Sequence, residues 1–341
     1  MIKKYKYNLV MSKIRKLYYF DKKSTEEMIS FLNNGAGDSY INRLMFNPFI
    51  LLHHLLPLKL KFLPESYVLQ DENSVKGLIT LAPIKSCNPK VEIQKLLFEE
   101  DFLAEAAELV QYTVSRYKAM GAVSVIVKVD DYLPELLNMF IYQCGFSQIS
   151  DEKLWRVTNF PETDYDKKTF RDFRNSDSES VAGLYNDSLL PHFRPLLGRD
   201  KTEFQEGIFR GLSCFSEYKY IIEDTQTKKT IGYISIKTTD NENYILDIIQ
   251  SGWSDLDINS VIHFASDKIK KRNKHFGLFL KSQRYTNLGE KYEEIFGQNG
   301  YECVQNQILL TNSSARVLKE TSKSGKYMIL SDFIPTNGIP T

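Results

Sequence analysis

The chain has 341 residues, and its 44 lysines and arginines balance 43 aspartates and glutamates, which argues against a nucleic-acid or membrane-surface partner. This length predicts one or two domains, each large enough for an ordinary hydrophobic core. The four cysteines form no CxxC or Cys/His ligand pattern, so we expect no metal site, and reduced thiols in a cytoplasmic protein.

Two features stand apart at the start of the chain. Residues 1–22 are basic and are expected to form a polar arm with no apolar secretory signal after it. The segment Phe46–Leu63 is rich in leucine but is interrupted by His53, Pro57 and Lys59. A transmembrane helix needs about 20 apolar residues, so we expect a buried helix here and no stable membrane span. A scaffold protein that uses this segment at a membrane is an alternative.

The next part of the chain predicts a sheet with helices against it. A hairpin is expected first, because Ser66–Gln70 and Lys76–Ala82 are rich in aliphatic and β-branched residues. Apolar residues then recur at strand spacing and at helical spacing. They predict, in order, a strand at Val91–Phe98, a helix at Asp101–Lys118, a strand at Val123–Val129, a helix at Tyr132–Tyr142 and strands at Phe146–Ile149 and Leu154–Thr158.

The second part of the chain predicts nearly the same order after a polar linker, residues 159–168. We expect a strand at Phe170–Phe173, a helix ending near Asn186, an irregular stretch at Ser188–Arg199, a helix at Thr202–Arg210, strands at Tyr218–Glu223, Thr230–Lys237 and Tyr244–Gln250, a helix from a Ser254 cap to Arg272, a strand at His275–Lys281, a helix at Leu288–Gln298 and strands at Tyr301–Val304 and Gln307–Thr311. The predicted units are therefore 23–158 and 169–311, with a tail at 312–341.

Glycine positions indicate that the second unit is a copy of the first. Gly77 lies 68 residues before Gly145, and Gly232 lies 68 residues before Gly300. One shift of 155 residues superposes both pairs, and a shared offset over this length is typical of a duplication. Each half therefore reads as a hairpin, a strand, a helix, a strand, a helix and a final pair of strands.

This order, together with Gly145-Phe146 and Gly300-Tyr301 after the second helix, resembles the GNAT superfamily of N-acetyltransferases in both halves. The resemblance implies an α/β fold class, with two tandem GNAT-like domains that each have a mixed sheet flanked by helices. It also implies an acyl-CoA-dependent N-acyltransferase. The co-substrate would be acetyl-CoA or another acyl-CoA, and the acceptor would be a small-molecule or peptide amine.

The family binds the CoA pyrophosphate at the N-terminus of the helix after the fourth strand, where backbone N–H groups and the helix dipole favour an anion. Its pattern Gln/Arg-x-x-Gly-x-Gly/Ala matches 101–106 here, with small residues at two of the expected positions. The resemblance therefore implies a CoA site formed by Leu96, Leu97, Phe98, Phe102, Leu103, Ala104 and Ala106.

The same comparison favours the first half over the second for CoA. The second window, 256–261, lacks the pattern altogether. In the first window Glu99, Glu100 and Asp101 would repel a diphosphate unless they are screened or turned away. As an alternative, Ala104 and Ala106 are simply good helix formers packed on a sheet.

Two carboxylates and one tyrosine are the candidate catalytic residues. The 155-residue shift superposes Glu92 on Asp247, and a carboxylate on this central strand could take a proton from an amine, directly or through water. The family often places a tyrosine that acts as general acid four residues before the glycine, where this chain has Ile141 and Phe296. Tyr142 is adjacent, but one residue turns a helix by about 100°. The alternative function is therefore a GNAT-fold protein that binds a partner or metabolite without catalysis.

Overall fold

The structure is a computed structural model, and it describes residues 13–21, 23–25, 27–28, 65–71, 74–84, 89–161, 163, 165–166, 169–206, 216–252, 254, 256–313, 320–321 and 327–328. The helix predicted within the segment Phe46–Leu63 lies outside these residues, as do most of the predicted arm and tail. Among the helices that are described, none is both long and apolar enough to cross a membrane.

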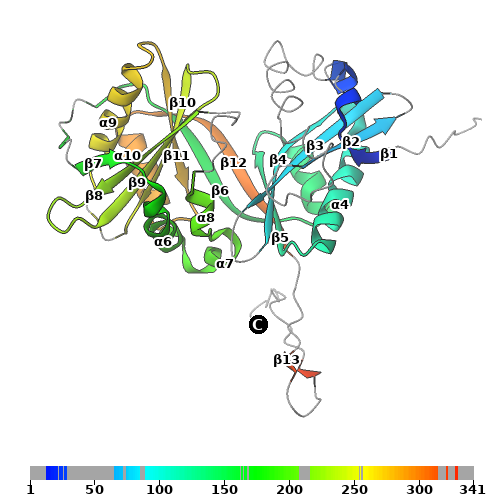
Figure 1. The fold of residues 1–341 in the computed structure, drawn as a ribbon. Helices are drawn as coiled ribbons and strands as arrows, with labels where there is room; N and C mark the ends of the chain where they lie inside the picture. The colour runs from blue at the N-terminus through cyan, green and yellow to red at the C-terminus, as the bar shows by residue number, and fades with distance from the viewer. Residues whose placement is uncertain are drawn as a thin grey trace, which may run out of the picture.

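The first half supplies a hairpin, a parallel strand pair and the helices between them (Figure 1). Its elements are β1 (Lys13–Lys16), η1 (Tyr19–Asp21), β2 (Glu65–Asp71), β3 (Ser74–Ile84), β4 (Lys90–Phe98), η2 (Glu100–Phe102), α4 (Leu103–Ala119), β5 (Ser124–Asp130), α5 (Pro134–Asn138), η3 (Met139–Gln143) and β6 (Ser147–Arg156). Residues 13–16 of the predicted arm thus form a strand, which pairs with β2.

The second half repeats this order with an additional group of short helices. Its elements are β7 (Phe170–Asp172), η5 (Asn175–Asp177), α6 (Ser178–Ser188), η6 (Pro191–Phe193), α7 (Arg194–Leu197), α8 (Lys201–Phe204), β8 (Ser216–Glu223), β9 (Thr230–Thr238), β10 (Asn243–Gln250), α9 (Ile258–Lys270), β11 (Gly277–Gln283), α10 (Gly289–Gln298) and β12 (Glu302–Ser313). In the tail, β13 (Glu320–Thr321) pairs with β14 (Tyr327–Met328).

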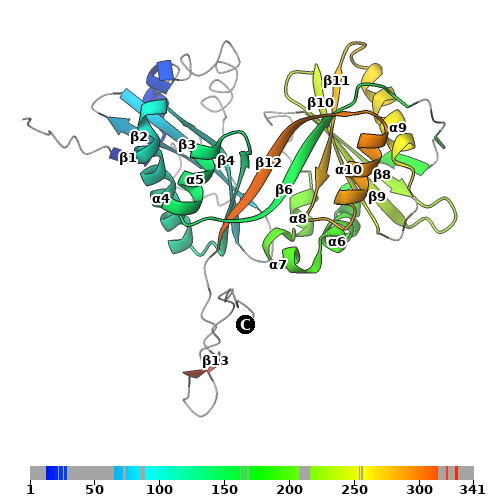
Figure 2. The same cartoon turned by 180° about the vertical axis from the view of Figure 1, so that it is seen from behind.

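The two halves share one 12-stranded sheet because they exchange their last strands. The strand order is β1-β2-β3-β4-β5-β12-β6-β11-β10-β9-β8-β7. Strand β12 from the second half pairs with β5 of the first half, and β6 from the first half pairs with β11 of the second. The two exchanged strands also pair with each other, and Figure 2 shows them crossing side by side between the halves.

The exchange corrects the prediction of two short strands at the end of each half. Residues 147–156 form one strand, and residues 302–313 form another. Each has to be long, since it must reach from its own half to the sheet of the other. The pairing of β12 with β6 is irregular at two places: between Cys303 and Gln305, next to the predicted break, and between Leu309 and Leu310, inside the predicted strand Gln307–Thr311.

Helices cover opposite faces of this sheet in different places. On one face, α4 and η3 enclose a core with the first-half strands, and α9 and α10 enclose a second core with the second-half strands. On the other face, α6, η6, α7 and α8 cover the middle of the sheet (Figure 1). That third core contains Ile126 from the first half together with Tyr233 and Leu309 from the second, so it joins the halves.

Local structure departs from the prediction at two sites in the second half. Asp257, rather than Ser254, is the N-cap of α9, and its carboxylate accepts hydrogen bonds from the backbone N–H groups of Asn259 and Ser260. Ser254 instead bonds back to the carbonyl of Ser251. The stretch expected to be irregular, Ser188–Arg199, contains the helical turns η6 and α7, which Pro191 begins.

Two of the four glycines used to detect the duplication, Gly145 and Gly300, have the same backbone conformation. Gly145 has φ +69° and Gly300 has φ +71°, a left-handed backbone that ends the helical segment before β6 or β12.

Gly300→Ala is therefore expected to lower the free energy of unfolding by about 1 kcal/mol, because an added Cβ is strained there. Chemical denaturation would measure this. The control is Gly297→Ala three residues earlier in α10, which has open space around it and should be neutral or stabilising. Equal effects of the two changes would contradict the argument.

Candidate active site

Each half contains an opening where two parallel strands stop pairing. Strands β4 and β5 pair only as far as Ile93 with Val127, although β4 continues to Phe98 and β5 to Asp130. This divergence is called the first opening. In the second opening, β10 and β11 pair as far as Leu246 with Leu280 and then separate. Beyond these levels, β4 forms no strand pair with β5, and β10 forms none with β11, among the residues that the structure describes.

The openings show which residues of the two halves are structurally equivalent. The last paired residues of the two halves are 153 positions apart on both strands. Lys128 and Lys281, each the next residue on its strand, are therefore counterparts. The 155-residue shift predicted that Glu92 and Asp247 are equivalent, but in the structure they stand at different levels of their strands. Glu92 pairs with Ile126 before the first opening, whereas Asp247 is the first residue beyond the second.

A charged cluster lies on the face of the sheet covered by α6, between the two openings. At its centre is Glu152 of β6, whose side chain is 5% exposed. Lys128 Nζ donates to Glu152 Oε2 at 2.9 Å, and the Tyr285 hydroxyl donates to the other carboxylate oxygen. Burial alone would raise the pKa of Glu152, but the charges of Lys128 and Lys281 and these hydrogen bonds outweigh it and lower the pKa to about 2.

Arg199 belongs to the same cluster and comes from the loop after α7. Its guanidinium lies over the ring of Tyr185 at 4.9 Å, and its backbone is held by two hydrogen bonds to the Asn186 side chain. Glu92 lies close enough that its charge raises the pKa of both Lys128 and Arg199. Glu92 itself is half-buried and makes no hydrogen bond or ion pair with any residue that the structure describes.

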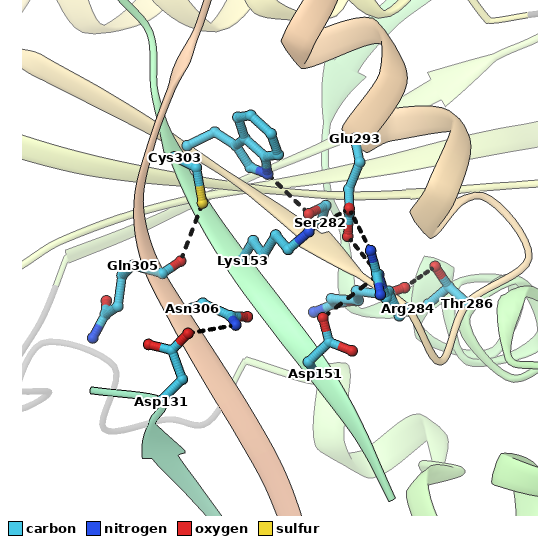
Figure 3. Close-up of polar contacts among 12 residues, drawn as sticks. Asp131, Asp151, Lys153, Ser282, Arg284, Thr286, Glu293, Cys303, Gln305 and Asn306 are labelled. Carbon is cyan, nitrogen blue, oxygen red and sulfur yellow. Dashed lines mark hydrogen bonds and ion pairs between the residues drawn. The ribbon is translucent and has the colours of Figure 1, made fainter. Parts of the chain in front are cut away.

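The strand that carries Glu152 is held in place from its other side (Figure 3). Neighbouring side chains on a strand point to opposite faces, so Asp151 and Lys153 face away from Glu152. Lys153 bonds Glu293 of α10 at 2.6 Å, and Arg284 contacts both Glu293, at 3.1 Å, and Asp151, at 3.5 Å. This network attaches the exchanged strand to the second half and so positions Glu152 within the cluster.

The helix N-termini beside the two openings differ in whether a side chain already occupies the place of an anion. No side chain caps α4, and Glu99, which precedes η2, forms an ion pair with Lys76, whose Nζ lies 3.0 Å from Oε2. The N-terminus of α9 is already occupied by the carboxylate of Asp257. A polar cavity of about 630 Å³ adjoins Asp257 and is also lined by Asp166, Glu223 and Asp224, which makes it unfavourable for a diphosphate.

In the second half, hydrogen bonds also join α10 to β10 and to α9 and so leave no open passage to the second opening between these helices. Tyr292 of α10 donates to Gln250 Oε1 at 2.9 Å, and the Gln250 amide donates to the carbonyl of Ser254. Asn299 at the end of α10 donates to Asn259 in the first turn of α9. In the first half the hydrogen bonds between α4 and residues 139–144 involve Ala107 and Gln111, and the first turn of α4 makes none to residues 139–144.

The residues predicted to hold CoA surround the first opening at different depths. Leu96, Phe98 and Leu103 pack partly buried on the α4 side, whereas Leu97 packs on the opposite face. Phe102 lies under the Lys76 ammonium, 5.3 Å from Nζ to the ring centre. Ala104 is exposed in the first turn of α4, and Ala106 is fully buried against the sheet. Ala104 thus has the small, accessible surface that the motif supplies, while Ala106 contributes to the core.

The candidate acid, Tyr142, is remote from the charged cluster. It lies in the π-helical turn η3 and its side chain is 80% exposed, while Ile141 packs partly buried against the first core. In the second half, Phe296 is buried and Tyr292 is the tyrosine that reaches the opening. Tyr292 lies eight residues before Gly300 rather than four, so a search for spacing by two helical turns would have found it.

No group of side chains with metal-ligating chemistry occurs among residues 13–328 where they are described. No model of a known protein family matches the sequence, and no curated protein matches it. Solved structures do match, and they define the fold as that of a tandem GNAT protein.

The similar structures are distant in sequence. A tandem GNAT protein from the clavulanic acid biosynthesis pathway, in a structure without acetyl-CoA, is 10% identical with a TM-score of 0.60, covering 89% of this chain and 99% of that one. A GCN5-related N-acetyltransferase from Sphaerobacter thermophilus is 10% identical, with a TM-score of 0.57 and coverage of 89% and 95%. The N-myristoyltransferase of Saccharomyces cerevisiae with bound myristoyl-CoA is 11% identical, with a TM-score of 0.51 and coverage of 89% and 79%.

Proposed function

We propose that the protein is an acyl-CoA-dependent N-acyltransferase that holds its thioester in the first opening. The observation that carries this proposal is the divergence of β4 and β5 beside a helix N-terminus that no side chain caps. In this proposal the edge of β4 beyond its last pair with β5 would bond the pantetheine amides, and the uncapped N-terminus of α4 would receive the pyrophosphate. The similar structures support an acyl-CoA co-substrate, either acetyl-CoA or a longer acyl-CoA, since one of them contains myristoyl-CoA.

In the proposed reaction, the amine nitrogen attacks the thioester carbonyl carbon, the carbon–sulfur bond breaks, and CoA leaves as its thiolate, which takes a proton from solvent. Glu92 would accept the proton from the amine, directly or through water, because it faces the charged cluster one level before the strands separate. The acceptor would be a small-molecule or peptide amine approaching from the α6 face. A cytoplasmic location remains a prediction.

A second function, ligand binding without catalysis, is favoured by one observation. Tyr142 is 80% exposed, and the positions four residues before Gly145 and Gly300 hold Ile141 and Phe296. The first opening therefore has no tyrosine from that position to protonate a leaving thiolate. Binding of acyl-CoA with no release of free CoA, for any amine offered, would select this second function.

A titration of the intact protein with acetyl-CoA and longer acyl-CoAs tests whether the first opening binds CoA. At 100 times the dissociation constant, the ligand should stabilise the folded state by about 2.7 kcal/mol, measured as a rise in Tm. Ala104→Glu should weaken binding at least about tenfold, because it places a carboxylate where the diphosphate would lie.

Two controls separate this site from general effects of charge. Ser115→Glu adds the same charge to an exposed position in the middle of α4 and should leave affinity unchanged. Asp257→Ala removes the cap of α9 and should cost about 1 kcal/mol of stability without changing affinity. If no acyl-CoA shifts the Tm of the folded protein, the proposed function is wrong. If Ala104→Glu and Ser115→Glu behave alike, the site is misplaced.

A further inference from the structure

The second opening keeps the geometry of the first but has lost its access for CoA. Its strands diverge at the equivalent level, 153 residues along the chain. The carboxylate of Asp257 occupies the helix N-terminus, and the hydrogen bonds of Tyr292 and Gln250 bridge α10 to β10. A ligand of this opening must therefore bind from the α6 face of the sheet, and it must bind without a pyrophosphate on the helix N-terminus. This side of the second opening is called its mouth.

Two opposite charges face each other at this mouth. Asp247 and Lys281 are the first residues beyond the last parallel pair on β10 and β11, so they stand at the same level. Ile249, two residues beyond Asp247, belongs to the core under α6, so Asp247 faces the same side. Lys281 lies on this face as well, because it pairs directly with Leu154, which shares a face of β6 with Glu152 two residues earlier.

Asp247 and Lys281 influence each other through their charges, but the structure shows no direct bond between them. Both side chains are half-buried, and neither forms a hydrogen bond or an ion pair with a residue that the structure describes. Parallel strands are about 4.8 Å apart where they pair and farther apart beyond, which separates the two groups. Glu152, the nearest alternative partner for Lys281, is engaged by Lys128 and by Tyr285. Lys128, the counterpart of Lys281 in the first half, donates to a carboxylate, whereas Lys281 donates to none that the structure describes.

The energetics favour a ligand that brings both missing charges. Removing a charge from water without a partner is costly, and burial together with the charge of Lys128 lowers the pKa of Lys281. Asp247 offsets this only in part. A ligand with one charge would satisfy one side chain and leave the other unpaired next to it, so a purely anionic or purely cationic ligand fits poorly.

We propose that the mouth of the second opening binds a zwitterionic α-amino acid, with its ammonium on Asp247 and its carboxylate on Lys281. The two ligand charges are adjacent on one carbon atom, which matches a carboxylate and an ammonium on neighbouring strands. The side chain of the amino acid would extend toward the aromatic side chains of the α6 face, among which Tyr185 and Tyr233 lie within range of the Asp247 charge. This site does not require the first opening to bind CoA.

The test is a thermal-shift and calorimetric screen of the intact protein against the L-amino acids. For each amino acid that binds, two analogues are measured: the amine without the carboxylate and the acid without the amino group. We expect at least one amino acid to raise the Tm, and each analogue to bind at least about tenfold more weakly. Asp247→Asn and Lys281→Met, which preserve side-chain size, should each weaken binding of that amino acid at least about tenfold.

Lys274→Met, a change at an exposed lysine before β11, is the control and should leave the affinity unchanged. The proposal is overturned if no amino acid stabilises the folded protein. It is equally overturned if either one-charge analogue binds as well as the amino acid, or if binding survives in both variants. Acetyl-CoA titration of the same samples keeps a failure here distinct from a failure of the proposed transferase.

Discussion

Glu92→Gln is expected to lower the rate of acyl transfer by about 10²–10⁴-fold while acyl-CoA still binds. Glutamine has nearly the same shape as glutamate but cannot accept the proton of the attacking amine. Glu92 is suited to this role because it lies beside the first opening and makes no ion pair with a described residue. Release of free CoA, followed with a thiol reagent in the presence of candidate amines, measures the rate.

The matched control for this prediction is Glu108→Gln on the exposed side of α4, which changes charge equally and should leave the rate unaltered. Binding of acetyl-CoA to the Glu92→Gln protein should match that of the unchanged protein, which separates loss of chemistry from loss of structure. A rate within twofold of the original would remove Glu92 as the base. Tyr142→Phe, measured in the same assay, tests the remaining candidate acid.

Glu152→Gln is expected to lower the free energy of unfolding by about 3 kcal/mol at pH 7. The change leaves Lys128 without its ion pair and replaces the carboxylate that Tyr285 bonds. Glu152 also lies on an exchanged strand, so a weakened cluster loosens the contact between the halves. Urea denaturation measures the loss, and Glu302→Gln at the exposed start of β12 is the control, expected to cost little.

The same variant should show a distinct dependence on pH. The pKa of Glu152 is lowered from 4.5 to about 2 in the folded protein, so its charge stabilises the fold above the unfolded pKa. This contribution is lost as the pH falls from about 4.5 toward about 2. The stability difference between the unchanged protein and Glu152→Gln should therefore shrink over this interval. A difference that stays constant between pH 5 and pH 3 would show that the carboxylate charge is not what stabilises the cluster.

Local patterns were sufficient to predict most elements and the fold class. Alternating aliphatic residues predicted the strand at Val91–Phe98, observed as Lys90–Phe98, and helical spacing predicted α4. Gly145 and Gly300 revealed the duplication because only glycine readily adopts their left-handed backbone. The order of elements then led to the tandem GNAT fold, which the solved structures confirm.

The candidate site was harder to predict, because its groups are neighbours only across strands. The sequence drew attention to Glu92 and Asp247, but the 155-residue shift treated them as equivalent positions, which the strand register does not support. It did not draw attention to Lys128, Glu152 or Lys281. Charged residues inside predicted strands resemble ordinary solvated positions until the partner strand is known.

The sequence by itself determined the elements, the duplication and the fold of each half, since hydrophobic spacing and glycine conformation act within a few residues along the chain. Only the tertiary structure decided that β6 and β12 change places between the halves. That exchange brings the Tyr285 hydroxyl to Glu152 from 133 residues away. Pairing between strands depends on which edges meet in space, and the residue pattern of one strand does not record its partner. The central charged cluster, and with it the candidate chemistry, therefore follows from the exchange.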